Sequence, residues 1–160
     1  MFKQSNNIFL IIIFAIISLA IISALIIQYW LGVEPCQLCF YQRIPYFLAI
    51  PLIVKIFFFK KYEKITLFIL FLIFIASAVL AFYHFGIEQG FFRESFVCKV
   101  GDLSGTLSKE QLLEQLNKNS ISCKDVSFRV LGLSLATINT ILSIMLSVIF
   151  LKLYLNYAKN

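Results

Sequence analysis

The sequence predicts an all-α integral membrane protein: a four-transmembrane-helix bundle with both termini cytoplasmic, and a short and a long loop on the other side. Composition is the first observation, since 61% of the 160 residues are apolar and only 14% are charged, whereas soluble domains average roughly 45–50% apolar residues. A small soluble domain cannot hide so much apolar surface. The composition therefore excludes a cytosolic globule, a disordered chain and a nucleic-acid-binding protein, despite the net charge of +6.

The second observation is the length of the apolar stretches. A helix needs about 20 mainly apolar residues to cross a hydrocarbon core about 30 Å thick, and four stretches qualify, at about 8–31, 40–59, 65–87 and 130–151. The first is longer than the roughly 7–15-residue core of a signal peptide, so we expect a membrane anchor. The second reaches full length only if the turn from Leu38 is added or if Lys55 snorkels to the surface. In lipid each stretch should be helical, because a helix satisfies its own backbone.

The third observation is the distribution of charge. With four spans, both termini share one side of the membrane with the linker between the second and third spans. That side carries seven basic residues and one acidic residue, namely Lys3, Lys55, Lys60, Lys61, Lys64, Lys152, Lys159 and Glu63. The other side carries equal numbers of both, so the positive-inside rule makes the first side cytoplasmic. We expect a single membrane domain, residues 1–160, with outer loops at about 32–43 and 88–129.

All four cysteines fall in the two expected outer loops. Cys36 and Cys39 lie in the short loop, and Cys98 and Cys123 lie in the long one. A free cysteine is usually a small buried hydrophobe, so chance placement would have put some of them in the spans. Disulfides form and persist outside the cytoplasm. Two pairs that face the same compartment therefore indicate thiol–disulfide chemistry.

Cys36-Gln37-Leu38-Cys39 is a C-x-x-C motif at the mouth of the second span. If the segment is helical, the two sulfurs share one face and lie near enough to exchange a disulfide. A helix N-terminus also favours the thiolate, which attacks disulfides or donates electrons. Arg43 follows on the same face, where its permanent charge would lower a thiol pKa or hold a polar acceptor. The alternative is a snorkelling arginine that only marks the interface.

The second cysteine pair and the sole histidine leave two interpretations each. Cys98 and Cys123 are separated by 24 residues, and a bond between them would stabilise the loop by roughly 3 kcal/mol in the chain-entropy model, so a purely structural disulfide is the alternative to a redox role. His84 lies near the outer end of the third span, where an ionisable side chain suggests function. It would carry a proton or bind a carbonyl, or else serve as an interfacial anchor. Glu88 lies one turn later and would orient it or remain a solvated loop charge.

These residues resemble a known family. Residues 35–43, PCQLCFYQR, fit the P-C-x-L-C-x-Y-x-R pattern of the bacterial disulfide bond formation protein B (DsbB) family. The motif lies between the first two of four expected spans, and the second cysteine pair lies between the last two, as in that family. The resemblance covers nearly the whole chain, and the motif in this topology is far more specific than C-x-x-C alone.

The resemblance implies a multi-pass enzyme of the bacterial inner membrane, a protein-dithiol:quinone oxidoreductase whose cysteine pairs face the periplasm. Its partner would be a periplasmic thioredoxin-like thiol oxidase of the DsbA kind. Its electron acceptor would be a quinone of the membrane pool, ubiquinone or menaquinone, which carries out the redox chemistry while the protein supplies position and charge. No metal is implied.

The resemblance also implies a role for each site residue. The partner's thiolate would attack Cys98 and form a mixed disulfide, and Cys123 would pass electrons to Cys36. Cys39 would lie closest to the quinone and reduce it, with Arg43 polarising the bound ring. His84 falls where the family has a histidine at the outer end of the third span, which implies a part in quinone binding.

Three alternatives remain at this point. A cysteine-based metal-binding or metal-transport membrane protein would use four cysteines for tetrahedral zinc or a C-x-x-C that passes a soft ion inward, although no Asp or Glu lies inside any expected span. A non-enzymatic scaffold would use two disulfides to brace its loops. A relative of the epoxide-reducing quinone enzymes would carry its C-x-x-C late in the chain rather than early.

Overall fold

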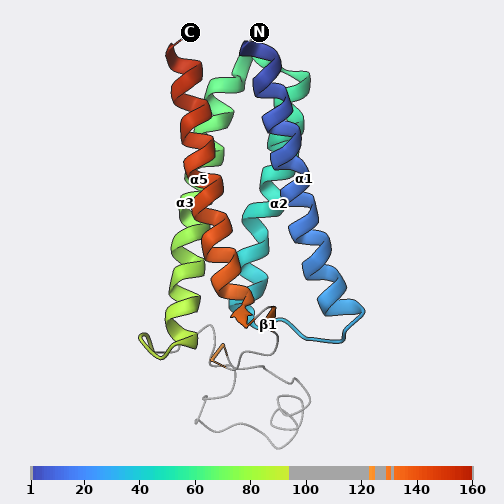
Figure 1. The fold of residues 1–160 in the computed structure, drawn as a ribbon, viewed down its shortest axis with the longest axis vertical. Coiled ribbons are helices and arrows are strands. Elements are labelled where there is room, and N and C mark those ends of the chain that lie inside the picture. Colours follow the sequence, from blue (N-terminus) through green and yellow to red (C-terminus); the bar gives the residue numbers. More distant parts are fainter. Residues whose placement is uncertain (1, 94–122, 125–128, 131, 160) are drawn as a thin grey trace, which may run out of the picture.

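The computed structural model describes residues 2–93, 123–124, 129–130 and 132–159, which form four long helices, one 3₁₀ turn and two short strands (Figure 1). In chain order the elements are α1 (Phe2–Tyr29), α2 (Gln37–Phe58), η1 (Lys60–Tyr62), α3 (Glu63–Glu88), β1 (Arg129–Val130), β2 (Leu133–Ser134) and α5 (Leu135–Lys159).

The four helices are each long and apolar enough to cross a membrane, over Ile8–Tyr29, Gln37–Phe58, Lys60–Glu88 and Leu135–Tyr157. The predicted all-α, four-span membrane protein is therefore confirmed. Several boundaries differ from the expected ones. The helix α1 begins at Phe2 rather than at about 8, and α2 begins at Gln37 rather than at about 40, so that Cys39 lies within it. The helix α5 runs over Leu135–Lys159 rather than over about 130–151.

The apolar residues just before α5 form a hairpin instead of extending the helix. The strand β1 pairs antiparallel with β2, with Arg129 opposite Ser134. Between the strands Gly132 has φ +83°, a conformation that glycine adopts without steric cost. Ser134 Oγ then accepts a hydrogen bond from the Thr137 N–H at 3.2 Å, as a serine does when it caps a helix N-terminus. Hydropathy alone merges these residues with the span that follows.

Aromatic rings from three helices pack against one another in the interior of the bundle. The rings of Phe74 and Phe150 stack with their centroids 5.5 Å apart, and the Tyr46 ring meets Phe74 edge-on at 5.5 Å. The helix α3 packs along α5, while α2 contacts both α3 and α1. Leu10 and Ile17 extend the same core onto α1. This packing fixes which face of α2, α3 and α5 points inward.

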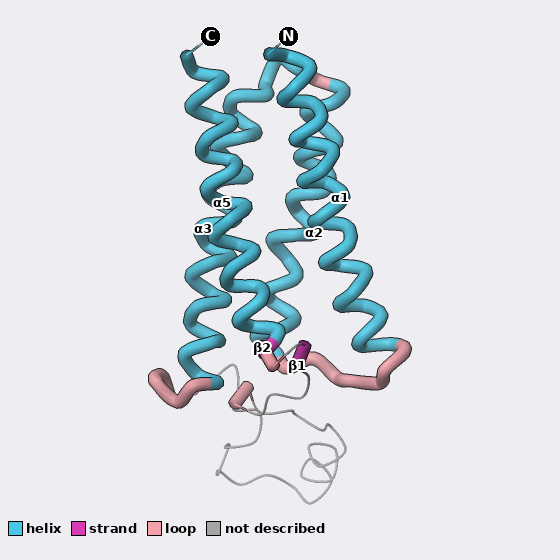
Figure 2. Tube along the Cα trace, viewed as in Figure 1, coloured by secondary structure: helices cyan, strands magenta, loops and turns pink. Residues whose placement is uncertain are grey.

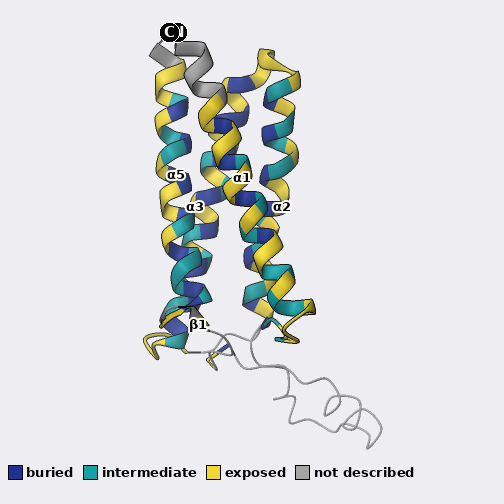
Figure 3. Cartoon of the chain, turned by 45° about the vertical axis from the view of Figure 1, so that its right-hand side comes forward, coloured by how far each residue is buried: buried dark blue, intermediate teal, exposed yellow. Residues whose placement is uncertain are grey.

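The outward faces of the helices carry large apolar side chains. Buried residues line the interior along each helix and exposed residues cover the outside (Figure 3). Phe9, Leu19, Val79 and Met145 each expose more than half of their surface. Soluble proteins rarely expose apolar surface on this scale, whereas lipid chains cover it without cost.

The two ends of the bundle differ in their chemistry. The start of α1 and the end of α5 lie at one end, together with the η1 turn that joins α2 to α3 (Figure 2). Lys60, Lys61 and Lys64 follow α2 at that end. The opposite end holds the end of α1, the start of α2 with its two cysteines, the end of α3 and the hairpin. The basic cluster and the thiol pair are thus separated by the length of the bundle.

Candidate active site

Cys36 caps the N-terminus of α2. Its backbone is extended, with φ −63° and ψ 164°, and its sulfur accepts a hydrogen bond from the Cys39 N–H at 3.3 Å. The Sγ atoms of Cys36 and Cys39 lie 2.8 Å apart, and both residues are free thiols. A disulfide bond measures about 2.05 Å. The predicted juxtaposition of the two sulfurs is therefore present, and a small side-chain movement closes the pair.

The environment of Cys36 favours its thiolate. The pKa of the Cys36 thiol is lowered from 9.0 to about 5, chiefly by a hydrogen bond from the Cys39 thiol; burial opposes this, and the His84 ring supplies a second hydrogen bond. The N-terminus of α2 also stabilises negative charge. At neutral pH Cys36 is therefore in the form that attacks disulfides and donates electrons.

His84 joins α3 to the thiol pair. Its Nε2 atom lies 3.6 Å from Cys36 Sγ, and its Nδ1 atom lies 2.9 Å from Nε2 of Gln42. The histidine is only 2% exposed. Nδ1 thus contacts Gln42 of α2 and Nε2 contacts Cys36, the cap residue of α2. His84 therefore lies beside the sulfurs.

Glu88 ties the same site to the beginning of α5. One carboxylate oxygen lies 3.7 Å from Nε2 of His84, and the other accepts a hydrogen bond from the Ser134 hydroxyl. Because Ser134 caps α5, Glu88 lies near the positive end of that helix dipole, where a carboxylate is stabilised. The end of α3 and the start of α5 are therefore held together next to the thiols.

Cys123 lies against the C-x-x-C pair. It is 1% exposed and belongs to one apolar cluster with Cys36, Leu38 and Ile87. Its backbone forms a hydrogen bond with the His84 side chain, and its sulfur is disulfide-bonded. The structure thus gathers Cys36, Cys39 and Cys123 around His84. Cys98, the fourth predicted site cysteine, lies outside the described residues, as does most of the expected loop at 88–129.

The guanidinium of Arg43 turns toward α1 rather than toward the sulfurs. It donates hydrogen bonds to Oε1 of Gln28 and, at 3.4 Å, to the carbonyl oxygen of Ala24. The hydrogen bonds that lower the pKa of Cys36 come instead from Cys39 and His84. Arg43 therefore fixes α1 against α2 one turn below the thiol pair, and the expectation that it would lower a thiol pKa is not met.

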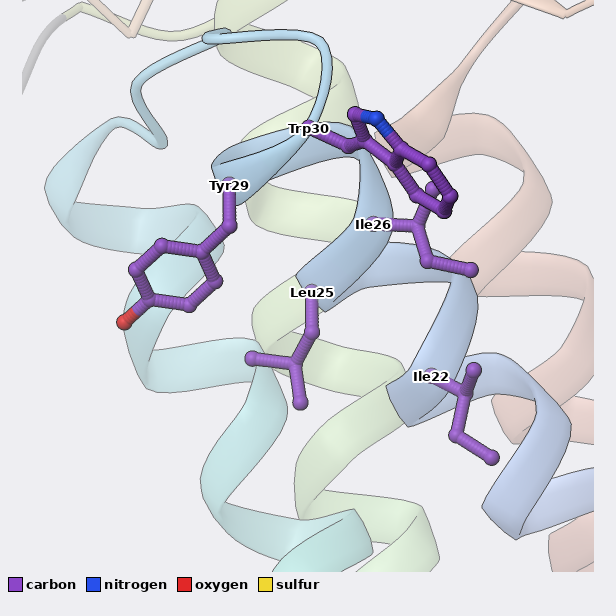
Figure 4. A pocket seen from close by; sticks show the side chains of 5 residues that line it. All are labelled: Ile22, Leu25, Ile26, Tyr29 and Trp30. Atoms are coloured by element: carbon purple, nitrogen blue, oxygen red, sulfur yellow. The ribbon is translucent and has the colours of Figure 1, made fainter.

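An apolar hollow of about 360 Å³ lies on the last turns of α1, at the thiol end of the bundle. Its lining consists of Ile22, Leu25, Ile26, Tyr29 and Trp30 (Figure 4). Tyr29 and Trp30 are 78% and 84% exposed, so the hollow opens to the outside of the bundle. Gln28, which holds Arg43, belongs to the same turn of α1.

Sequence reasoning missed the buried amides that support the site. Gln42 is 6% exposed and contacts His84, and its own Oε1 accepts a hydrogen bond from Asn139 of α5 at 2.8 Å. The sequence did contain a signal for Gln42. A polar side chain inside a membrane span is costly in lipid unless it has a hydrogen-bond partner. Gln42 also follows Cys39 by three residues, which places both on one helix face.

A helical membrane bundle with two close thiols at the mouth of one span, one of them with a lowered pKa, defines a membrane thiol–disulfide oxidoreductase. The family model described as disulfide bond formation protein DsbB matches residues 6–153, and the chain belongs to this family. It is also 28% identical over 160 residues to a Rickettsia prowazekii (strain Madrid E) protein described as "Uncharacterized protein RP370", a match that covers 99% of this chain and 92% of that protein. The chain is thus an oxidoreductase of disulfide-bond formation in a membrane.

The lowered pKa of Cys36 predicts the pH dependence of its alkylation. The thiolate is present above pH 5 or so and is lost as the pH falls through that value, whereas an unfolded cysteine forms thiolate only near pH 9. Between pH 6 and 8 we expect the iodoacetamide rate at Cys36 in the reduced, folded protein to change less than about two-fold, while the denatured chain gains about 100-fold. Site-resolved mass spectrometry measures both rates.

The matched variant is Cys39→Ala, which removes the main hydrogen-bond donor to the Cys36 sulfur and should move the rise in rate toward higher pH. A folded wild-type protein whose Cys36 rate climbs about ten-fold per pH unit up to pH 8 would show that the thiolate is not stabilised.

Proposed function

We propose that this protein is a thiol:quinone oxidoreductase that re-oxidises a periplasmic thioredoxin-like oxidase and passes the electrons to a membrane quinone. The observation that carries the proposal is the thiol pair itself. Cys36 and Cys39 have their sulfurs 2.8 Å apart at the first turn of a membrane span, where lipid-soluble and aqueous reactants are both near.

The proposed electron path uses two disulfide exchanges and one quinone reduction. The partner's dithiol reduces the Cys98–Cys123 disulfide, with Cys98 attacked first, and leaves with a disulfide of its own. The two resulting thiols reduce the Cys36–Cys39 disulfide by exchange, which needs a thiolate, a leaving sulfur and access. Burial of Cys123 in one cluster with Cys36 supports this step.

In the last step the Cys36 thiolate and the Cys39 thiol give up two electrons and one proton and form their disulfide, while the quinone takes up these electrons and this proton, together with a second proton from the solvent, and becomes a quinol. Cys39 lies inside the helix, one turn deeper than the cap residue Cys36, which supports contact of Cys39 with an acceptor dissolved in lipid. A bound quinone supplies an oxidising ring with two carbonyl oxygens.

The surroundings of Arg43 are suited to such a ring. The guanidinium is held at α1 by Gln28, and the apolar hollow lies on the same turns of α1. A permanent cation beside an apolar surface offers a hydrogen-bond donor to a carbonyl oxygen and contact to the ring and its tail. Ubiquinone and menaquinone both meet this description.

Charge supports the orientation. One end of the bundle carries Lys60, Lys61 and Lys64. The same end holds both termini, and it lies opposite the cysteines. The positive-inside rule then puts the basic end in the cytoplasm and the thiol pair at the periplasmic face of a bacterial inner membrane.

Metal binding is the alternative that one observation favours. Among the described residues, Cys36, Cys39 and His84 place three ligand atoms within 4.8 Å of one another. However, two sulfurs on one tetrahedral zinc, each at about 2.3 Å, lie about 3.8 Å apart, whereas these sulfurs are 2.8 Å apart. The shorter separation suits a pair that closes to a disulfide. One equivalent of zinc in the purified protein, without quinone reduction, would favour the metal site instead.

Removal of Cys123 should trap the partner. In Cys123→Ala the lone Cys98 thiol attacks the disulfide of the oxidised partner, and this protein then has no mate for Cys98 that would resolve the mixed disulfide, so we expect a disulfide-linked adduct to a soluble thioredoxin-like protein. Non-reducing electrophoresis and mass spectrometry of cells expressing the variant detect it. The control is the double variant Cys98→Ala/Cys123→Ala, which should form none. An adduct that persists in the double variant, or none in either, would refute the assigned path.

Replacement of Arg43 should weaken quinone binding. Arg43→Met removes a charge-assisted hydrogen bond, and we expect the KM for a short-chain quinone to rise about ten-fold or more, as measured by the absorbance of the quinone in steady-state assays. Gln28→Leu is the matched control, because it removes the tie to α1 and keeps the cation; its KM should stay within about three-fold of wild type. Equal increases in both variants would mean that Arg43 only holds α1 in place.

A further inference from the structure

A row of hydrogen-bonded polar side chains crosses the interior of the bundle and ends at the thiol pair. It draws on α2, α3 and α5, and the proposed electron path uses none of its members. In order toward the thiols the row consists of Ser77, Ser143, Tyr46, Asn139, Gln42 and His84.

The hydrogen bonds of the two amides in this row run in one direction. The Tyr46 hydroxyl donates to Asn139 Oδ1 at 2.5 Å, and Asn139 Nδ2 donates to Gln42 Oε1 at 2.8 Å. Gln42 Nε2 is then the atom that faces His84 Nδ1, at 2.9 Å. An amide NH₂ group can only donate, so Nδ1 accepts and carries no proton. The proton of the neutral imidazole therefore lies on Nε2.

The other side of the ring selects the same tautomer. Nε2 of His84 lies 3.6 Å from Cys36 Sγ and 3.7 Å from Glu88 Oε1. A thiolate and a carboxylate are both acceptors. An unprotonated Nε2 would face these two negative groups with no hydrogen to donate, whereas a protonated Nε2 donates its N–H toward both.

The two amides hold one another in this orientation. Each has one partner on either side, so rotation of Gln42 alone would set an NH₂ group against the NH₂ of Asn139 and an oxygen against the Nδ1 lone pair. Such mismatches between buried polar groups are costly. Reversal therefore requires both amides and the Tyr46 hydroxyl to turn together.

We propose that Gln42 and Asn139 are positioning residues that keep the proton of His84 on Nε2, so that the ring donates a hydrogen bond to the Cys36 thiolate whenever the Cys36–Cys39 pair is reduced. The role in the cycle rests on the proposed function, but the tautomer is a property of the protein alone. Among the described residues, the ionisable groups that face the ring are Cys36 and Cys39 at the start of α2 and Glu88 from α3, while the nearby Cys123 is disulfide-bonded.

The first test reads the tautomer directly. His84 is the sole histidine of the sequence, so the full chain, labelled with ¹⁵N-histidine, carrying a tag without histidine and reduced in detergent micelles, gives one imidazole signature. We expect a protonated Nε2 and an unprotonated Nδ1 at pH 7. A wild-type spectrum with the proton on Nδ1 overturns the proposal, whatever any variant does.

The second test breaks the row at Asn139. In Asn139→Leu the Gln42 amide is free to turn, so we expect a mixture of the two tautomers and an alkylation rate at Cys36 about five-fold lower at pH 6. If Asn139→Leu does not fold, Gln42→Met replaces it. This variant removes the amide that donates to His84 Nδ1, and we expect the same two changes. The matched control is Thr140→Val, because the buried Thr140 hydroxyl donates to its own helix at Ala136, outside the row; it should change neither readout.

A row that merely joins the helices would give a different result. Both variants would then lower the unfolding temperature with the tautomer and the Cys36 rate unchanged, and the proposal would be wrong. If the tautomer and the rate respond as expected but added quinone is never reduced by the wild type, the proposed function fails and the positioning role stands.

Discussion

The site depends on one constraint: polar side chains inside a bundle that lies in lipid must satisfy one another. No water or polar solvent is available at that depth, and an unpaired buried group is costly. Among the described residues no buried side-chain nitrogen or oxygen lacks a hydrogen-bond partner. Several interior groups achieve this by pairing between helices, as Gln42 does with His84 of α3 and Asn139 of α5. These pairs also fix the rotation and height of the helices that bring His84 to the thiols.

The position of the thiol pair follows from the start of α2. Because Cys36 caps the helix and Cys39 lies in its first turn, one residue borders the loop while the other lies within the span. A pair placed deeper would be closed to a soluble protein, and a pair placed in a loop would be remote from a lipid-soluble acceptor. The cap also supplies the backbone N–H and the helix dipole that favour a thiolate.

Much of the fold could be predicted from hydropathy, because a long apolar segment in lipid satisfies its backbone hydrogen bonds by forming a helix. The start of α5 could not, because the hairpin before it also contains the apolar residues Val130 and Leu133, and only Gly132 marks the turn. The C-x-x-C pair and His84 were identifiable from their residue types and positions. The Gln42–Asn139 contact was not, because those residues are 97 positions apart and meet only through the packed orientation of two helices. Arg43 shares a helix face with Cys39, yet its guanidinium donates a hydrogen bond to Gln28 of α1. Residue spacing along a single helix cannot reveal such a contact with another helix.

The central claim is that Cys36 and Cys39 deliver electrons directly to a lipid-soluble acceptor. A single turnover without oxygen tests it, using the reduced Cys98→Ala/Cys123→Ala protein, in which the C-x-x-C pair is the sole source of thiols, and one equivalent of a short-chain ubiquinone. Absorbance follows the quinol and mass spectrometry follows the cysteines. The account predicts one quinol formed for each Cys36–Cys39 disulfide. Absence of quinol, or quinol formed while both thiols stay free, would contradict it.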